Sequence, residues 1–157
     1  MQIHDRALRP AWSGLMHDPP RPIFCLIVED DPLVGLDLAE VLEADGYYVA
    51  GPFRSGREAS RWLDRFTPDV AVVDFALADG LCRELVATLQ ARQIGFVIHS
   101  GSLRSQYPAG SSGNEVWIEK PTSIAAIATA LQQLLALQKA DRDATPPCCA
   151  ATRVSIS

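Results

Sequence analysis

The chain has 157 residues, and its 14 Lys and Arg against 19 Asp and Glu give a formal net charge of −5. This acidic balance argues against a protein that binds nucleic acid or anionic membrane surfaces, and no apolar run reaches the roughly 20 residues that span a bilayer. The cysteines do not have the spacing of a zinc site and favour a reducing compartment, so the composition predicts a soluble, cytoplasmic protein; they are Cys25, Cys82, Cys148 and Cys149.

The chain is predicted to contain one folded domain with an extension at each end. Residues 1–22 mix isolated apolar residues with prolines and show no sustained period, so a flexible N-terminal extension is expected there. Apolar segments with strand and helix periods fill residues 23–140, which we interpret as the domain. Residues 141–157 again lack a period and are expected to form a disordered C-terminal tail.

The domain opens with a buried strand that is followed by three acids. Residues 23–28 are apolar and predict the strand, and Glu29, Asp30 and Asp31 come directly after it. Asp31 before Pro32 is a standard helix start, which leaves Glu29 and Asp30 free to face a crevice. Because adjacent like charges repel, this placement indicates that a cation neutralises them.

A helix and a short strand follow. Apolar residues at helical spacing predict a helix over residues 33–44, and the next apolar segment predicts a strand over residues 47–50. Ser55 and Glu58 then have the spacing of a capping box, in which each side chain satisfies a backbone donor of the first helical turn. We therefore expect a second helix that continues through residue 65.

The next strand carries the acid around which the site is predicted. Residues 70–73 are uniformly apolar, which is typical of a strand covered on both faces in a parallel sheet, and Asp74 lies at its end. In open α/β sheets ligands bind beyond the carboxyl ends of the strands, so Asp74 is placed for chemistry. A lone aspartate at a strand end can also cap the next turn. The case for chemistry therefore depends on the other strand ends.

Two further strands also end in polar residues. A helix is predicted over residues 80–90, and an apolar strand over residues 96–100 ends in Ser100. A fifth strand over residues 116–119 is followed by Lys120. The order of strands and helices therefore keeps alternating along the chain.

One place in this alternation lacks a clear helix. Residues 102–114 occupy the position of a fourth helix, but Pro108, two glycines and several serines give the segment little helical preference. The last helix is predicted to begin at Ile124, after a cap at Thr122 or Ser123.

Alternating strand–helix units predict an α/β fold with a doubly wound, five-stranded parallel sheet. In that fold the strand ends meet at one edge of the sheet, which brings together Glu29, Asp30, Asp74, Ser100 and Lys120. Three carboxylates favour a hard cation such as Mg²⁺. With that charge neutralised, Asp74 can act as a nucleophile toward phosphorus, while Lys120 and Ser100 contact the phosphoryl oxygens.

These residues also carry a resemblance to a known family. The chain resembles the receiver domains of two-component response regulators over about residues 23–139, through the motifs Val28-Glu29-Asp30-Asp31-Pro32, Val73-Asp74, His99-Ser100-Gly101 and Lys120-Pro121. The resemblance implies a flavodoxin-like fold with strand order 2-1-3-4-5. Among receiver domains, the chain most resembles the stand-alone type that is typical of chemotaxis regulators.

The resemblance implies roles for the acids. Asp74 would accept a phosphoryl group from a histidine kinase or a histidine phosphotransfer protein. Glu29, Asp30 and Asp74 would hold Mg²⁺, and the backbone carbonyl of Ala76 would be a further ligand.

The resemblance also implies a switch. Ser100 matches the switch hydroxyl of the family, and Lys120 matches the lysine that contacts the phosphate. Trp117 stands where the family usually has Tyr or Phe, whose rotamer couples to the hydroxyl; ordinary strand packing is an equally good interpretation of Trp117. Residues 102–114 fall on the face that the family commonly uses for output, and their poor helical preference puts a conventional switch there in doubt.

The sequence predicts how the signal leaves the domain only in outline. The tail is short and does not have the basic residues that DNA contact needs, so output is expected through a protein partner or a phosphorelay, without nucleic acid or membrane. No enzymatic activity is expected beyond the protein's own phosphorylation and dephosphorylation. Two alternatives remain: a degenerate receiver that binds partners without phosphorylation, and a Mg²⁺-dependent phosphohydrolase with an aspartyl nucleophile. Such hydrolases usually carry a second Asp where this chain has Ala76.

Overall fold

The computed structural model describes residues 21–80, 82–101 and 113–144. These residues form five parallel strands in the order β2-β1-β3-β4-β5 together with four helices, which confirms the predicted fold and strand order. The elements are β1 (Ile23–Val28), α1 (Pro32–Ala44), β2 (Tyr47–Phe53), α2 (Gly56–Leu63), β3 (Val70–Asp74), α3 (Cys82–Ala91), β4 (Gly95–Ser100), β5 (Glu115–Glu119) and α4 (Ile124–Ala144).

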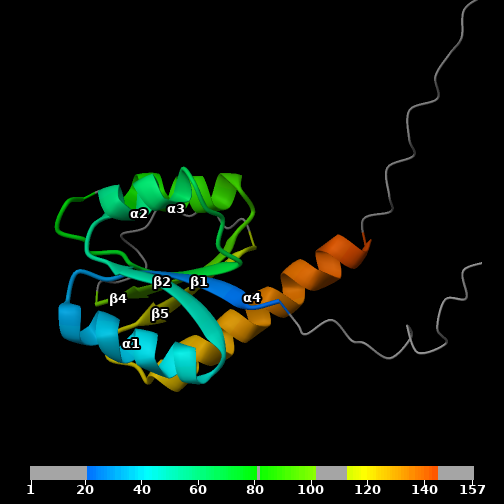
Figure 1. The fold of residues 1–157 in the computed structure, drawn as a ribbon, viewed down its shortest axis with the longest axis horizontal. Coiled ribbons are helices and arrows are strands. Elements are labelled where there is room, and N and C mark those ends of the chain that lie inside the picture. The colour runs from blue at the N-terminus through cyan, green and yellow to red at the C-terminus, as the bar shows by residue number, and fades with distance from the viewer. Residues whose placement is uncertain (1–20, 81, 102–112, 145–157) are drawn as a thin grey trace, which may run out of the picture.

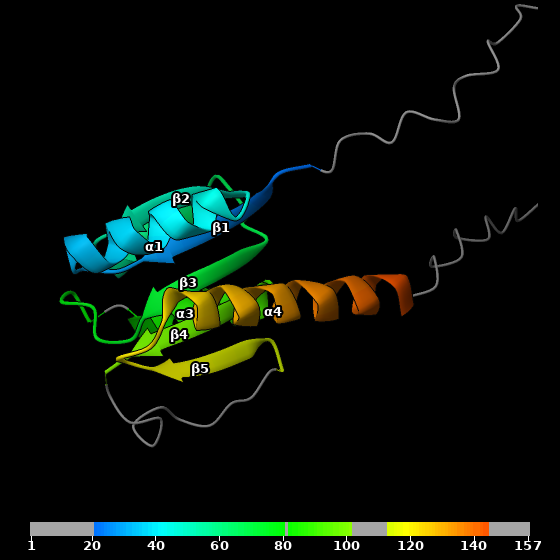
Figure 2. The same ribbon diagram turned by 90° about the horizontal axis from the view of Figure 1, so that it is seen from below.

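The sheet is the middle of three layers (Figure 1). Helices α2 and α3 cover one face, and α1 and α4 cover the other. Figure 2 shows the strands side by side with all arrows pointing the same way, so the carboxyl ends of the strands share one edge of the sheet. Within the described residues, no helix combines the length and the apolar character that a membrane span requires.

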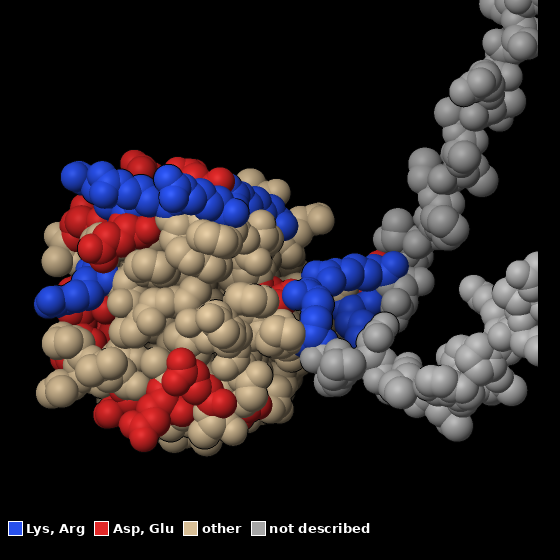
Figure 3. Space-filling model, in the orientation of Figure 1, with Lys and Arg blue, Asp and Glu red and all other residues tan. Residues whose placement is uncertain are grey.

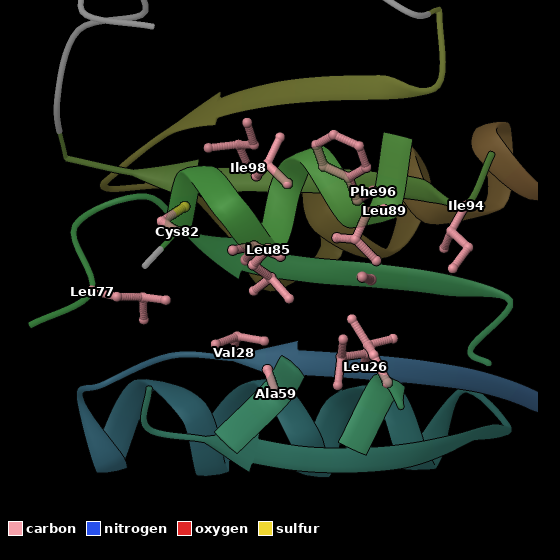
Figure 4. Packing of buried hydrophobic residues seen from close by; sticks show 14 of the residues in the cluster. Leu26, Val28, Ala59, Leu77, Cys82, Leu85, Leu89, Ile94, Phe96 and Ile98 are labelled. Carbon is pink, nitrogen blue, oxygen red and sulfur yellow. The ribbon is translucent and has the colours of Figure 1, made fainter. Parts of the chain in front are cut away.

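Each face of the sheet has its own apolar core. Toward α2 and α3, alternate strand residues such as Leu26 and Phe96 pack against Leu85 of α3, and all three are fully buried (Figure 4). Toward α1 and α4, the intervening residues Ile27 and Val97 are buried as completely. This burial on both sides explains why the central strands show uniform apolar runs in place of the alternation of a half-exposed sheet.

Two of the predicted helix caps form. The Oδ1 atom of Asp31 accepts hydrogen bonds from the backbone N–H groups of Leu33 at 2.9 Å and Val34 at 3.3 Å. The Ser123 hydroxyl oxygen accepts from the N–H of Ala126 at 3.3 Å. The first of these caps also fixes the direction in which the chain leaves the acidic end of β1.

The capping box of α2 forms with one difference. The Ser55 hydroxyl accepts from the Glu58 N–H at 3.2 Å, as predicted. The Glu58 carboxylate accepts from the N–H of Arg54 at 3.1 Å, one residue earlier than in the standard box.

Strand β2 is longer than the sequence predicts. A Gly-Pro pair reads as a strand end, yet β2 continues through Gly51 and Pro52 to Phe53. Gly51 has a φ of +111°, and a Cβ atom there would lie 2.5 Å from the carbonyl oxygen of Ile27. The register of the β1–β2 pairing shifts at this point. Since β2 is an edge strand, it tolerates a bulge and a proline that a central strand would not.

The last helix is also longer than predicted. Helix α4 continues to Ala144, past the expected start of the tail at residue 141. Residues 141–144 contain no helix breaker, and the first one is Pro146, which disfavours helical backbone at the residue before it. Three predictions lie wholly or mostly outside the described residues: the flexible extension over 1–22, the helix-poor segment 102–114 and the rest of the tail over 145–157.

Candidate functional site

The strand ends bring the predicted site residues to one edge of the sheet. Glu29 and Asp30 follow β1, and Asp74 is the last residue of β3. Ser100 is the last residue of β4, and Lys120 directly follows β5. Because β3 lies between β1 and β4, Asp74 has a strand end on each side.

The ammonium group of Lys120 lies between two carboxylates. Its Nζ donates to Oε2 of Glu29 and to Oδ2 of Asp74, each at 2.8 Å. The side chains of Glu29 and Asp74 are only 3% and 6% exposed, and that of Lys120 is 25% exposed. Burial alone lowers the pKa of Lys120, but the hydrogen bonds to Asp74 and Glu29, together with their charges, outweigh burial and raise it. Lys120 is therefore charged at neutral pH and links the ends of β1, β3 and β5.

Three carboxylates converge beside this ammonium group. Glu29, Asp30 and Asp74 offer oxygens that all lie within 4.8 Å of one another. Burial raises the pKa of Glu29; the hydrogen bond from Lys120 opposes this effect, and the charge of Asp74 adds to it. Three carboxylates against one ammonium leave negative charge in excess. Since hard divalent cations such as Mg²⁺ take oxygen ligands and carboxylates above all, this donor set fits such a cation.

Backbone hydrogen bonds hold the two buried carboxylates. Oδ1 of Asp74 accepts from the N–H of Ala76 at 2.9 Å, on the side away from Lys120's contact with Oδ2. Oε1 of Glu29 accepts from the N–H of Asp31 at 3.3 Å. Ala76 itself is exposed at the start of the loop after β3, and its carbonyl as a metal ligand stays a prediction.

Ser100 adjoins Lys120 through the backbone. It is fully buried, and its carbonyl oxygen accepts a hydrogen bond from the N–H of Lys120 at 2.8 Å. The structure therefore places Ser100 in the same corner as the lysine. The switching role of its hydroxyl stays a prediction.

Trp117 packs against the apolar core on one face of the sheet. Its ring packs against the core beneath α2 and α3, with its centroid 5.5 Å from that of Phe75. Phe75 directly follows Asp74, so Trp117 contacts the residue next to the acid. Phe75 could not be predicted as a partner of Trp117, because a ring contact between β5 and the loop after β3 depends on the tertiary fold.

His99 is part of the motif His99-Ser100-Gly101, but no role in the site was predicted for it. It pairs with Asp74 between β4 and β3 and is 7% exposed. Neither of its ring nitrogens has a hydrogen-bond partner among the described residues. Burial lowers the pKa of His99, the charge of Lys120 lowers it further, and Asp74 opposes both. A titratable residue inside an otherwise apolar strand is the sequence feature that could have identified it.

The chain matches a known family in sequence. A family model for the response regulator receiver domain matches residues 25–132. The chain is 28% identical over 120 residues to the transcriptional regulatory protein PdtaR of Mycobacterium tuberculosis, covering 73% of this chain and 58% of that protein. It is 32% identical over 71 residues to a putative transcriptional regulator of Pseudomonas aeruginosa, covering 44% of this chain and 33% of that protein. The chain thus spans little more than half of the first relative and a third of the second.

Solved structures with the same fold support this match. The CheY-like receiver domain from Methylobacillus flagellatus has a TM-score of 0.61 at 26% identity, over 72% of this chain and 98% of that one. A CheY-like receiver domain protein from Methanospirillum hungatei has a TM-score of 0.68 at 22% identity, over 76% of this chain and 98% of that one. At the lower identity the likeness shows the fold alone.

Proposed function

This chain belongs to the response regulator receiver family, and from that membership and the site geometry we propose that Asp74 accepts a phosphoryl group from a histidine kinase or a histidine phosphotransfer protein. The observation that carries the proposal is the position of Lys120, whose ammonium lies 2.8 Å from both Asp74 and Glu29. A strand-ending acid that only caps a turn needs neither an ion pair with a lysine nor two neighbouring carboxylates.

The proposed transfer makes and breaks one bond to phosphorus. A carboxylate oxygen of Asp74 attacks the phosphorus of a phosphohistidine, the P–N bond breaks, and its electron pair returns to the imidazole nitrogen, which takes a proton from solvent. Lys120 offsets charge on the phosphoryl oxygens, and the Ser100 hydroxyl donates to one of them. Attack of water on the acyl phosphate later restores Asp74 and releases inorganic phosphate. We propose no catalysis on any other substrate.

We propose that Glu29, Asp30 and Asp74 hold Mg²⁺, with the Ala76 carbonyl as a further ligand. The three carboxylate oxygens within 4.8 Å of one another support this assignment. When bound, the ion supplies positive charge that lets an anionic phosphodonor approach a carboxylate.

A protein phosphodonor must contact the surface beside Asp74. Helix α1 begins directly after the acidic end of β1, and its Leu33 and Leu36 are 72% and 59% exposed. Exposed leucines next to a polar crevice favour protein contact, because an apolar surface gains most by being covered. We propose that the donor docks on this end of α1.

We propose that the phosphorylated chain passes its signal to a protein partner or to a further phosphotransfer step, with Ser100 and Trp117 as the responding residues. Both relatives described above are transcriptional regulators by name, but the chain spans only part of each.

We also propose a cytoplasmic location. The free thiols of Cys25 and Cys82 support it, and burial raises the pKa of each to about 12, which makes both unreactive.

Acetyl phosphate tests the acceptor directly. In the presence of Mg²⁺, intact-mass spectrometry should show one added phosphate on the parent chain and none on Asp74→Asn. The exposed carboxylate of Asp64 offers a matched control, so Asp64→Asn should be modified as fully as the parent. Asp30→Asn should need more Mg²⁺ for the same yield. Equal modification of Asp74→Asn would reject the acceptor, and no modification of any variant would favour a receiver that works without phosphorylation.

A further inference from the structure

Helix α2 carries a stripe of arginines on its outer face. Arg57, Arg61 and Arg65 are exposed and follow one another at intervals of four residues, which places them on one side of a helix. The helical turn continues past the end of α2, since the N–H of Arg65 donates to the Trp62 carbonyl at 3.0 Å. None of the described ion pairs uses these three arginines. Their charge is therefore available to something outside the described fold.

An aromatic hollow lies along this stripe. It has a volume of about 640 Å³ and is lined by Phe53, Glu58, Arg61, Trp62, Asp64, Arg65 and Phe66. The rings of Trp62 and Phe66 stack with centroids 5.2 Å apart, and Phe53 lies 6.2 Å from Trp62. Phe66 nevertheless stays 55% exposed. A large apolar side chain that reached this hollow would contact aromatic rings between two arginines.

The exposed charges of the molecule are unevenly distributed. In Figure 3, Lys and Arg gather across the top, where Figure 1 draws α2 and α3, with some Asp and Glu beside them; a second group of Lys and Arg lies at the far end of α4, and Asp and Glu gather at the bottom over α1. Exposed acids on α1 are Asp37, Glu40 and Glu43. A chain of net charge −5 thus presents a locally basic face. Such a face attracts acidic partners even though the whole molecule repels them at long range.

We propose that the outer face of α2 is a docking site for an acidic segment of a partner protein that carries one large apolar side chain. The apolar side chain enters the hollow against Phe66 and Trp62, and the acids pair with the arginine stripe. Aromatic residues and Arg are enriched in protein interfaces, because they offer a large contact area, and Arg and Trp also donate hydrogen bonds. A long polyanion such as single-stranded nucleic acid is disfavoured, because the whole chain carries a net charge of −5 and repels it.

This surface is separate from the phosphoacceptor. It lies on the outer side of α2, whereas the Asp74 cluster lies at the carboxyl edge of the sheet, so the two can be tested independently. Fluorescence anisotropy with the full chain provides the test. The probe is a short labelled peptide of Glu and Asp around one central Trp, compared with a version in which Trp is replaced by Ser and a version in which the acids are replaced by Lys.

The acidic Trp peptide should bind, and the Lys version should not. The double variant Arg61→Glu, Arg65→Glu should weaken binding by about tenfold or more, as expected for residues at the centre of an interface. Lys139→Glu, an exposed lysine on α4, is the matched control and should leave affinity unchanged. Phe66→Ala should weaken binding of the Trp peptide by a larger factor than binding of the Ser peptide. The double variant and Phe66→Ala should keep the far-ultraviolet circular dichroism spectrum of the parent, which shows that they fold.

Several results would overturn the docking site. Binding of all three peptides with equal affinity, or binding that survives Arg61→Glu, Arg65→Glu, would remove it. Sedimentation that shows the parent chain to be a dimer, separated by the same double variant, would make a second copy of the chain the occupant. Displacement of the acidic peptide by an oligonucleotide of thymidine at lower concentration would indicate nucleic acid.

Discussion

At the scale of single residues, Lys120 determines the electrostatic state of the site. It is the only ammonium in contact with Glu29 and Asp74 among the described residues, and both carboxylates are almost fully buried. Removing one partner of a buried ion pair costs much more than the pair contributes, because it leaves uncompensated charge. The stability of the fold and the chemistry of Asp74 therefore both depend on this side chain.

The variant Lys120→Met tests this dependence. It keeps most of the apolar stem but leaves two buried carboxylates unpaired. We therefore expect the free energy of unfolding to fall by about 2–3 kcal/mol, less than the roughly 3–5 kcal/mol for a fully buried pair, because Lys120 is partly exposed. Urea unfolding in EDTA measures the loss. Addition of Mg²⁺ should reduce the difference in the free energy of unfolding between variant and parent, since a cation at the carboxylates replaces part of the missing charge. An equal difference with and without Mg²⁺ would contradict a cation site at these acids.

His99 predicts a pH dependence of stability. Its folded pKa lies below the ordinary value of 6.5, so the folded state resists the proton that the unfolded chain takes up. The stability is therefore complete above pH 6.5 and falls as the pH drops below it, toward the folded pKa. The raised pKa of Glu29 acts in the opposite sense, because protonation of a buried carboxylate relieves its desolvation.

The variant His99→Val isolates the histidine from this background. Urea unfolding of parent and variant in EDTA at pH 7.5 and 5.5 should show the parent losing more stability than the variant on acidification. At pH 7.5 the variant should be at least as stable, because it removes buried ring nitrogens that have no partner among the described residues. A parallel decline of both proteins with pH would show that His99 does not titrate differently on folding.

At the scale of elements, Asp79 connects the loop after β3 to the start of α2. Its carboxylate accepts from the N–H groups of Gly56 at 3.2 Å and Arg57 at 3.0 Å. The carboxylate thus accepts hydrogen bonds from the first N–H groups of α2, as a neighbouring cap residue would, although it belongs to a loop that is distant in sequence. Because this loop directly follows Asp74, the contact joins the segment after the acceptor to the start of α2.

The variant Asp79→Ala should destabilise the protein by about 1–2 kcal/mol, as loss of a charged helix cap does. Amide hydrogen exchange should locate the effect, with faster exchange in the first turn of α2 and unchanged exchange in α4. Asp64→Asn, at the other end of α2, serves as the comparison and should change neither. Uniformly faster exchange across the fold would mean that Asp79 supports the whole domain and not this helix end.

Elements were predictable where a local rule decides them. Asp31 and Ser123 cap helices because a side-chain oxygen next to free N–H groups is a local arrangement. The predicted end of β2 before Gly51 was wrong. Whether the strand continues through a bulge depends on its pairing with β1, which is distant in sequence. The contact of Asp79 with α2 was missed for the same reason.

At the scale of the whole molecule, the sequence predicted which residues form the site but not the contacts that they make. Parallel strands place all carboxyl ends at one edge, so Glu29, Asp74 and Lys120 could be grouped from the order of elements. The periodicity of apolar residues predicts which face of a strand is buried, but it does not predict which residues that face contacts. It could not show that His99 would lie beside Asp74, or that Phe75 would meet Trp117. The hollow beside α2 likewise appears only after β2 and α2 pack together.

The measurement that tests the central claim most directly is chemical mapping of the phosphorylated residue. Borohydride reduces an acyl phosphate to an alcohol and so converts a phosphorylated aspartate to homoserine. After incubation with a phosphorylated histidine phosphotransfer protein and Mg²⁺, fragmentation mass spectrometry should find homoserine at position 74 alone, and EDTA should abolish it. Homoserine at Asp30 or another acid with position 74 unchanged, or none after full consumption of the donor's phosphate, would contradict Asp74 as the acceptor.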